Sequence, residues 1–133
     1  MPEGSAGVGS YHSWKATLRN DAIVITEKIR FSLGKADIKP ESKGVIADIA
    51  ALIKAHAGIS VAIEAHTGVT GTAESNMQMS EGRARSVMQA LVDQGVSASR
   101  LSAVGRGQKR PVVPNTTAEN RARNRRIEFI VRR

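Results

Sequence analysis

Two consecutive segments decide the fold: Val61-Ala-Ile-Glu-Ala-His-Thr-Gly68 and, after a short polar loop, Asn76-Met-Gln-Met-Ser-Glu-Gly-Arg-Ala-Arg-Ser-Val-Met-Gln-Ala-Leu91. In the first segment Val61, Ile63 and Ala65 would share one face of a β-strand and Ala62, Glu64 and His66 the other. The second repeats apolar residues three and four positions apart, which indicates an amphipathic helix. We therefore expect a strand, a polar turn and a long helix, with hydroxyl, amide and guanidinium groups gathered at the junction.

Further strands and one further helix are expected on both sides of this stretch. Three runs predict strands, at residues 22–26 (extended by Ile29 and Phe31), 100–104 and 125–131, beside the central strand at 59–65. A helix should begin at Pro40, because proline suits the first helical turn, and Val45, Ile49, Leu52 and Ile53 then recur at helical spacing. Loops are expected at 32–37 and 105–120. The order βαβαβ-β predicts a two-layer α/β (α+β) sandwich with the helices on one face of a mixed sheet.

Length and composition predict a single domain and leave its redox compartment undecided. The 133 residues are 41% hydrophobic but only 3% aromatic, so one domain with an aliphatic core is expected over residues 20–133. Residues 1–19 should form a flexible lead or linker. No cysteine is present, and no apolar run reaches the length of a membrane helix. The Gly- and Ser-rich start does not resemble a signal peptide, which favours a domain excised from a longer protein.

Positive charge is concentrated at the end of the chain. Residues 100–133 hold ten Lys/Arg against two Glu, a balance of +8 that equals the net charge of the whole chain. Such a patch attracts nucleic acid, anionic lipid or an acidic wall polymer, or is simply solvated. The nucleic-acid reading rests on the run Arg121–Arg126, but stacking aromatic residues are missing there, so nucleic acid is not the expected partner.

Motifs for catalysis, metals and cofactors are missing from the sequence. Gly105-Arg-Gly107 lacks the rest of a phosphate-binding fingerprint. His12, His56 and His66 show no metal-ligand spacing, and Glu64 stands as a lone carboxylate. We expect no enzyme activity, no metal and no cofactor. His66, at the end of a strand, is expected to be a hydrogen-bonded structural residue.

Several short matches in a fixed order resemble the OmpA-like family, which includes peptidoglycan-associated lipoprotein and the periplasmic part of flagellar stator proteins. The matches are Ile29-Arg-Phe31, Ala65-His-Thr67, Met79-Ser80, Arg83-Ala84, Val87, Leu91, Gly95-Val96, Arg100-Leu101, Val104-Gly-Arg-Gly107, Pro111, Asn115 and Asn124-Arg-Arg-Ile-Glu128. Together they cover residues 21–131. The resemblance implies a periplasmic or outer-membrane-associated domain within an envelope or motility assembly. Such a domain binds peptidoglycan non-covalently and catalyses no reaction on it.

The resemblance also implies a binding site for the diaminopimelate of a stem peptide. Arg83 matches the family's arginine for the ligand carboxylate, and a guanidinium can bind a carboxylate through two hydrogen bonds. Asn76 matches a polar loop residue, while Thr67 and Asn124-Arg125-Arg126 match residues that line or support the pocket. A surface ion pair with Glu81 or Glu64 is the alternative role for Arg83.

The match fails where the family places the aspartate that takes the ligand's ammonium, because Gly68 stands there. Ser32 likewise stands where several relatives have an acid. Loss of one charge-assisted hydrogen bond weakens binding by about 1.5–3 kcal/mol. Three readings remain open. In the first, the domain still binds the wall, with Glu74 as a substitute acid. In the second, the Arg83 pocket binds another anion. In the third, the fold serves as a structural or protein-interaction module.

Overall fold

The computed structural model describes residues 11, 12, 14–69 and 71–133. A six-stranded sheet has the order β1-β2-β3-β6-β4-β5. Its strands are β1 (Tyr11–His12), β2 (Ala16–Leu18), β3 (Ala22–Ile25), β4 (Ser60–His66), β5 (Leu101–Gly107) and β6 (Arg126–Arg132). The helices are η1 (Pro40–Ser42), α1 (Lys43–Ala55), α2 (Ala73–Asp93), η2 (Ala98–Arg100) and α3 (Ala118–Asn124). In the described residues, no helix is both long and apolar enough to span a membrane.

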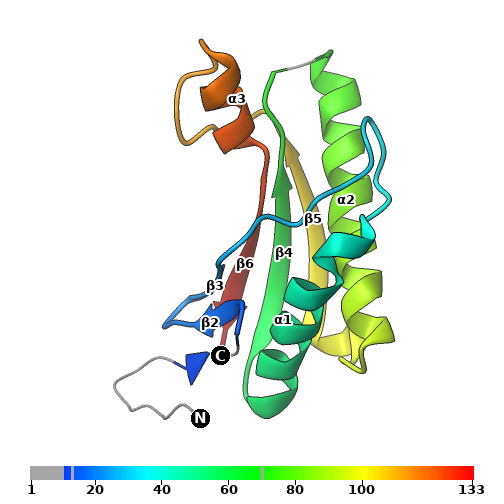
Figure 1. The fold of residues 1–133 in the computed structure, drawn as a ribbon, viewed down its shortest axis with the longest axis vertical. Helices are drawn as coiled ribbons and strands as arrows, with labels where there is room; N and C mark the ends of the chain where they lie inside the picture. Colours follow the sequence, from blue (N-terminus) through cyan, green and yellow to red (C-terminus); the bar gives the residue numbers. More distant parts are fainter. Residues whose placement is uncertain (1–10, 13, 70) are drawn as a thin grey trace.

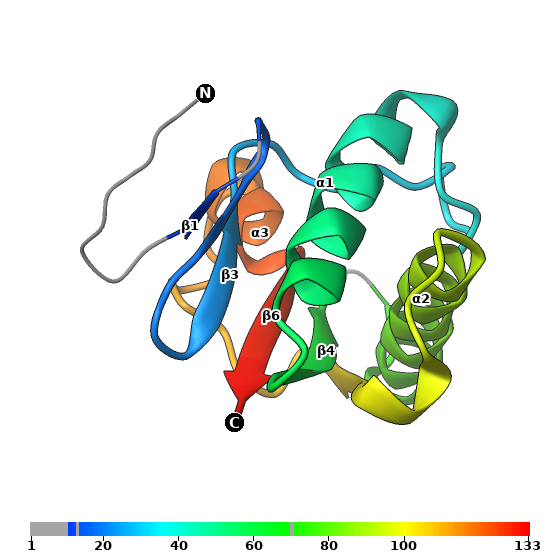
Figure 2. The same cartoon turned by 90° about the horizontal axis from the view of Figure 1, so that it is seen from below.

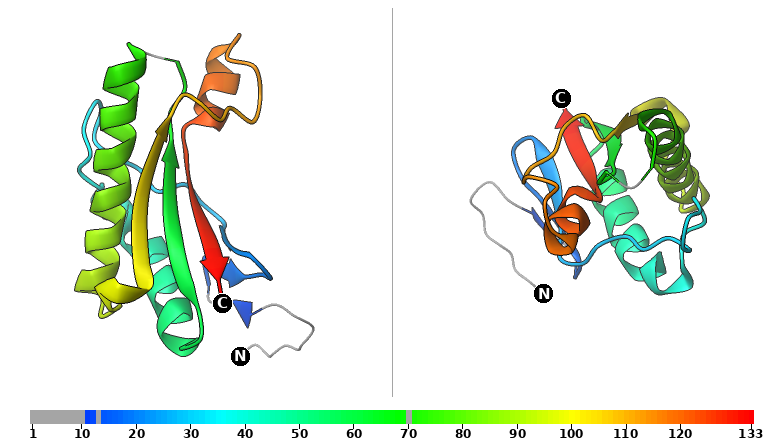
Figure 3. Two further views of the ribbon diagram at one scale, coloured as in Figure 1. Left: turned by 180° about the vertical axis from the view of Figure 1, so that it is seen from behind. Right: turned by 90° about the horizontal axis from the view of Figure 1, so that it is seen from above.

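Strand β4 lies between β5 and β6 and sets the register of the sheet. It runs parallel to β5, with Ile63 opposite Ala103, and antiparallel to β6, with Ile63 opposite Phe129. Both α1 and α2 cover one face of this sheet, whereas α3 lies beyond the end at which β4 finishes and β6 begins (Figures 1 and 3). The predicted two-layer arrangement of helices on a mixed sheet is therefore confirmed.

The core between the two layers is aliphatic, as the composition predicts. Helix α1 buries Val45, Ile49 and Ile53 completely. These side chains recur every four residues and so share one helical face. The view along the molecule in Figure 2 shows α1 and α2 side by side against the sheet. Phe129 of β6 is 2% exposed and is the largest fully buried side chain of this core.

The ordered sheet begins earlier than expected. Within the segment predicted as a flexible lead, β1 pairs with β2 and β2 pairs with β3. Ala16 and Leu18 bury their side chains in the core, while Trp14 is fully accessible at 86% exposure. The rest of the predicted lead, residues 1–10 and 13, lies outside the described residues.

Two helix boundaries also differ from the prediction. Helix α2 starts at Ala73, three residues before the helical segment quoted from Asn76, because the Thr72 side chain caps it by accepting a hydrogen bond from the Ser75 N–H at 3.0 Å. Helix α3 occupies the end of the predicted 105–120 loop and continues to Asn124. Its cap is Thr117, whose hydroxyl accepts from the Asn120 N–H at 3.0 Å. Phe31 does not continue β3 either, and instead forms an isolated bridge with Ile38.

Candidate functional site

A cleft of about 900 Å³ opens where β4 ends. Its walls come from the segment between β3 and η1, the end of β4, the first turns of α2 and the start of β6. Of the residues predicted from the sequence, Thr67, Asn76, Arg83, Arg125 and Arg126 line it together. These residues are far apart in the sequence, and the return of β6 alongside β4 brings them to one end of the sheet.

Arg83, near the middle of α2, lines the cleft and lies against the loop after β3. Its Nε donates to the Lys35 carbonyl oxygen at 2.9 Å, and its guanidinium carbon lies 4.7 Å from the centre of the Phe31 ring. Burial, followed by the nearby charge of Arg125, lowers the pKa of Arg83. Within the described part of the chain no carboxylate pairs with Arg83, so the expected alternative of an ion pair with Glu81 or Glu64 is not formed. The terminal nitrogens remain available to a ligand.

Thr67 and Asn76 form the floor of the cleft. The Thr67 N–H donates to the Gly107 carbonyl at 2.9 Å, and the Asn76 amide donates to Gln108 Oε1 at 2.6 Å. Both contacts fix the cleft to the end of β5, where the Gly107 N–H donates to Ser80 Oγ of α2 at 2.9 Å. The Thr67 hydroxyl is buried and finds no hydrogen-bond partner among the described residues. Buried polar atoms are rarely left unpaired, so this hydroxyl is a candidate to bond a ligand.

Asn124 supports the site instead of lining it. Its Oδ1 accepts from the N–H groups of Val112 and Val113 at 2.8 and 3.2 Å. Its Nδ2 donates to the Val113 carbonyl and to Asn115 Oδ1 at 2.8 and 2.9 Å. The fully buried side chain therefore closes the loop between β5 and α3. This loop carries the chain to Arg125, an exposed residue at the cleft.

Arg126 is held in place by three bonds. Its Nε donates to Glu128 Oε2 at 2.6 Å, and its terminal nitrogens donate to the carbonyls of Asn124 and Arg110 at 3.1 and 3.0 Å. Its charge is therefore balanced by Glu128. Arg126 shapes the wall, while the neighbouring Arg125 has no carboxylate partner in the described part of the chain.

Three other residues raised by the sequence do not line the cleft. The Ser32 N–H donates to the Asp37 carbonyl at 2.9 Å, and this hydrogen bond closes the loop between the two residues. Glu74 lies exposed in the first turn of α2, so the structure gives no support to its role as a substitute acid. Gly68 is buried beneath α3, and a Cβ there would lie 2.9 Å from the Arg121 carbonyl oxygen. This close approach favours glycine at position 68.

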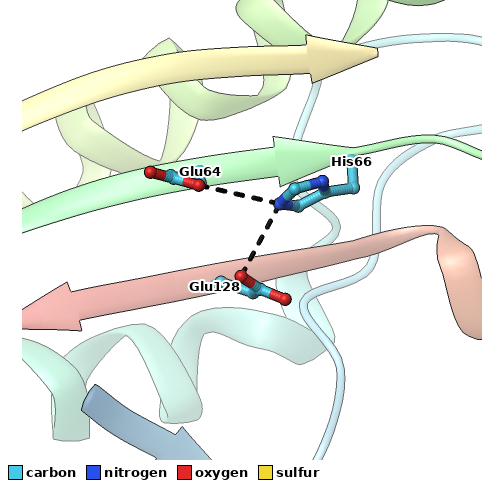
Figure 4. Close-up of side chains that lie close together, drawn as sticks. All are labelled: Glu64, His66 and Glu128. Carbon is cyan, nitrogen blue, oxygen red and sulfur yellow. Dashed lines mark ion pairs between the residues drawn. The ribbon is translucent and has the colours of Figure 1, made fainter. Parts of the chain in front are cut away.

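A second polar group includes His66, which lines the cleft, and was not predicted from the sequence (Figure 4). Glu64 is not a lone carboxylate, because Arg106 Nη2 lies 3.0 Å from its Oε2. His66 Nε2 lies 3.9 Å from Glu64 Oε1 and 3.7 Å from Glu128 Oε1. These distances exceed hydrogen-bond length, and neither ring nitrogen of the buried His66 has a hydrogen-bond partner among the described residues. Only the register of β4 against β6, which sets Glu64 opposite Glu128, could have revealed this group.

The same three side chains could be considered as metal ligands, since their ligand atoms lie within 4.8 Å of one another. However, Arg106 already neutralises Glu64 and Arg126 already neutralises Glu128. A divalent cation would therefore enter a charge-balanced group next to two guanidinium ions, which opposes its binding. We interpret the group as a structural ion network at the end of the central strands.

The network predicts a loss of stability in mild acid. Burial, reinforced by Arg126 and Arg106 against the opposing Glu128 and Glu64, lowers the pKa of His66. The unfolded chain therefore takes up a proton before the folded protein does, and stability should fall as the pH drops below about 6.5. We expect His66→Gln to flatten the dependence of the urea midpoint on pH between about 7 and 5.

Glu64 does not produce the same effect in this window, because its bond to Arg106 lowers its pKa and it stays ionised. An unchanged slope in His66→Gln would mean that His66 is not the group that titrates.

Comparison with known proteins identifies the family to which a domain with this cleft belongs. A sequence model described as the OmpA family matches residues 30–125. The chain belongs to the OmpA family. This domain is 41% identical over 101 residues to outer membrane porin F of Pseudomonas aeruginosa, covering 75% of the chain and 29% of the porin. It is 39% identical over 99 residues to peptidoglycan-associated lipoprotein of Pseudomonas putida, covering 74% of the chain and 59% of the lipoprotein.

A solved structure gives the same answer for the fold of this OmpA-family domain. A MotB-like protein from Desulfovibrio vulgaris superposes with a TM-score of 0.76 at 28% identity, covering 94% of this chain and 78% of that one. The resemblance read from the sequence is therefore confirmed. One of these relatives is named an outer membrane porin and the other a peptidoglycan-associated lipoprotein, which agrees with the cell-envelope setting expected from the sequence. The chain spans less than two thirds of the length of each of these relatives, at 29% and 59%.

Proposed function

We propose that this OmpA-family domain is a non-catalytic module that binds peptidoglycan and anchors a larger envelope assembly to the cell wall. The cleft beside Arg83 holds the diaminopimelate end of a stem peptide. One observation carries the proposal: the residues that match the family's pocket line one cleft, namely Thr67, Asn76, Arg83 and Arg125. The half-buried guanidinium of Arg83 has no carboxylate partner among the residues that the structure describes. The relative named peptidoglycan-associated lipoprotein supports the choice of ligand.

Calorimetric titration with two soluble stem peptides tests the proposal. One contains diaminopimelate, and the other contains lysine at the same position, which lacks the side-chain carboxylate. The diaminopimelate peptide should bind at one site. The lysine peptide should bind about tenfold or more weakly, because Arg83 then loses a charge-assisted bond of about 1.5–3 kcal/mol. Equal binding of the two peptides, or none, would contradict the proposed site.

Position 68 offers a way to strengthen the same site. Both Gly68→Asp and Gly68→Ala add a Cβ within 2.9 Å of the Arg121 carbonyl, so both should lose about 1–3 kcal/mol of stability as α3 shifts. Only the aspartate adds a carboxylate that can take the ligand's ammonium. We expect Gly68→Asp to bind the diaminopimelate peptide about tenfold more tightly than Gly68→Ala.

The alanine variant is the reference in this comparison because it reproduces the steric change without the charge. If the two variants bind equally, position 68 does not face the ligand's ammonium.

A further inference from the structure

The charges that line the cleft are unbalanced. Four of its basic residues have no carboxylate partner in the described part of the chain, namely Lys28, Lys39, Arg83 and Arg125. Burial, followed by the charges of Arg125, Arg30 and Arg126, lowers the pKa of Lys28. The folded protein therefore holds like charges together without internal compensation. A ligand that supplies negative charge relieves this repulsion.

Acidic groups that could receive a cation are scarce in the same cleft. Glu27 is the one carboxylate among the described lining residues, and it is paired with Lys15 at 3.3 Å on the exposed side. Position 68 cannot present an acid without moving α3, since its Cβ would meet the Arg121 backbone. A further polar group on the floor is the buried Thr67 hydroxyl, which has no hydrogen-bond partner among the described residues and can donate to an anion.

We infer that the cleft recognises only the anionic groups of its ligand, and that it accepts stem peptides whose terminal amine is blocked at least as well as those with a free amine. This inference rests on the proposed function and specifies its substrate class. A blocked amine is the chemical state of a stem peptide joined to a neighbour through an amide. The domain would then bind joined and free stem peptides alike, instead of free ends alone.

The test compares a diaminopimelate stem peptide with the same peptide acetylated on its distal amine, by calorimetry on the full chain. An ammonium near several uncompensated cations is repelled by a few tenths of a kcal/mol from each in water. The acetylated peptide should therefore bind with equal affinity or up to about tenfold more tightly. Raising the salt from about 0.05 to 0.5 M should weaken its binding severalfold, because the remaining attraction is between charges.

A pair of variants at the rim provides the internal control. Leu33 lines the cleft and is 97% exposed, so its replacement does not disturb the core. Leu33→Glu should shift the preference toward the free-amine peptide by about two- to threefold, while the uncharged Leu33→Gln should not.

The outcomes separate the two claims. If the free-amine peptide binds the parent threefold or more tightly than the acetylated one, the inference is wrong and the proposed function stands. If neither peptide binds, the proposed function fails and the inference fails with it. Equal or tighter binding of the acetylated peptide, with the Leu33→Glu shift, supports both.

Discussion

Gly105→Ala should destabilise the domain by about 3 kcal/mol or more. Gly105 lies in β5 directly against α2, and a Cβ there would lie 2.5 Å from Glu81 Cγ and 2.7 Å from Glu81 Cα. Some of these clashing atoms belong to the backbone of α2, which cannot move aside as the end of a flexible side chain can. Overpacking typically costs about 1–3 kcal/mol, and a backbone clash belongs at or above the upper end. Urea unfolding of the variant and the parent measures the difference.

Gly58→Ala is the matched control for this change. Gly58 precedes β4, and no atom beyond its chain neighbours lies within 4 Å of its added Cβ. The variant should be neutral, or more stable by up to about 1 kcal/mol, because alanine restricts the unfolded chain. A small effect at Gly105 would mean that α2 does not approach β5 as closely as described. The cleft would then be wider, since α2 also carries Arg83 and Asn76.

Arg83→Gln should reduce binding of the diaminopimelate peptide by about 10- to 100-fold. The substitution removes the half-buried positive charge of the cleft and the planar pair of donors that matches a carboxylate. A charge-assisted hydrogen bond contributes about 1.5–3 kcal/mol, which corresponds to this range of affinity. Calorimetry with the free-amine peptide gives the ratio.

Arg85→Gln is the control on the same helix. Arg85 is exposed, does not line the cleft, and differs from Arg83 by two positions, which places it on another side of α2. Binding by this variant should match the parent within about twofold. Since Arg83 also holds the loop at Lys35, the urea midpoint of Arg83→Gln must be measured in parallel. Equal binding in both variants would remove Arg83 from the site.

Much of the fold could be predicted because its central elements repeat a simple pattern. The alternation in β4 and the apolar spacing in α1 and α2 indicate strand and helix directly. Helix α3 could not be predicted this way, because its seven residues include exposed arginines and no apolar stripe. Strands β1 and β2 are two and three residues long, too short for a period to emerge.

Some residues of the candidate site could likewise be predicted from the sequence, and others could not. Thr67 directly follows β4, and Asn76 and Arg83 lie on α2, so the expected strand–turn–helix junction and the resemblance to the family together indicated a shared site. Asn124 is different, because a motif match does not distinguish a residue that contacts the ligand from a buried residue that supports the site. Its four hydrogen bonds to neighbouring residues show that it supports the site. The grouping of Glu64, His66 and Glu128 depends on strand register, which a single sequence does not specify.

Titration of the isotopically labelled domain with the diaminopimelate peptide, followed by backbone amide NMR, tests the central claim most directly. We expect saturable shift changes concentrated around the cleft, at Thr67, Asn76, Arg83 and Arg125. Changes confined to the far end of the sheet, near Leu101 and Arg132, or the absence of any change at millimolar peptide, would contradict it.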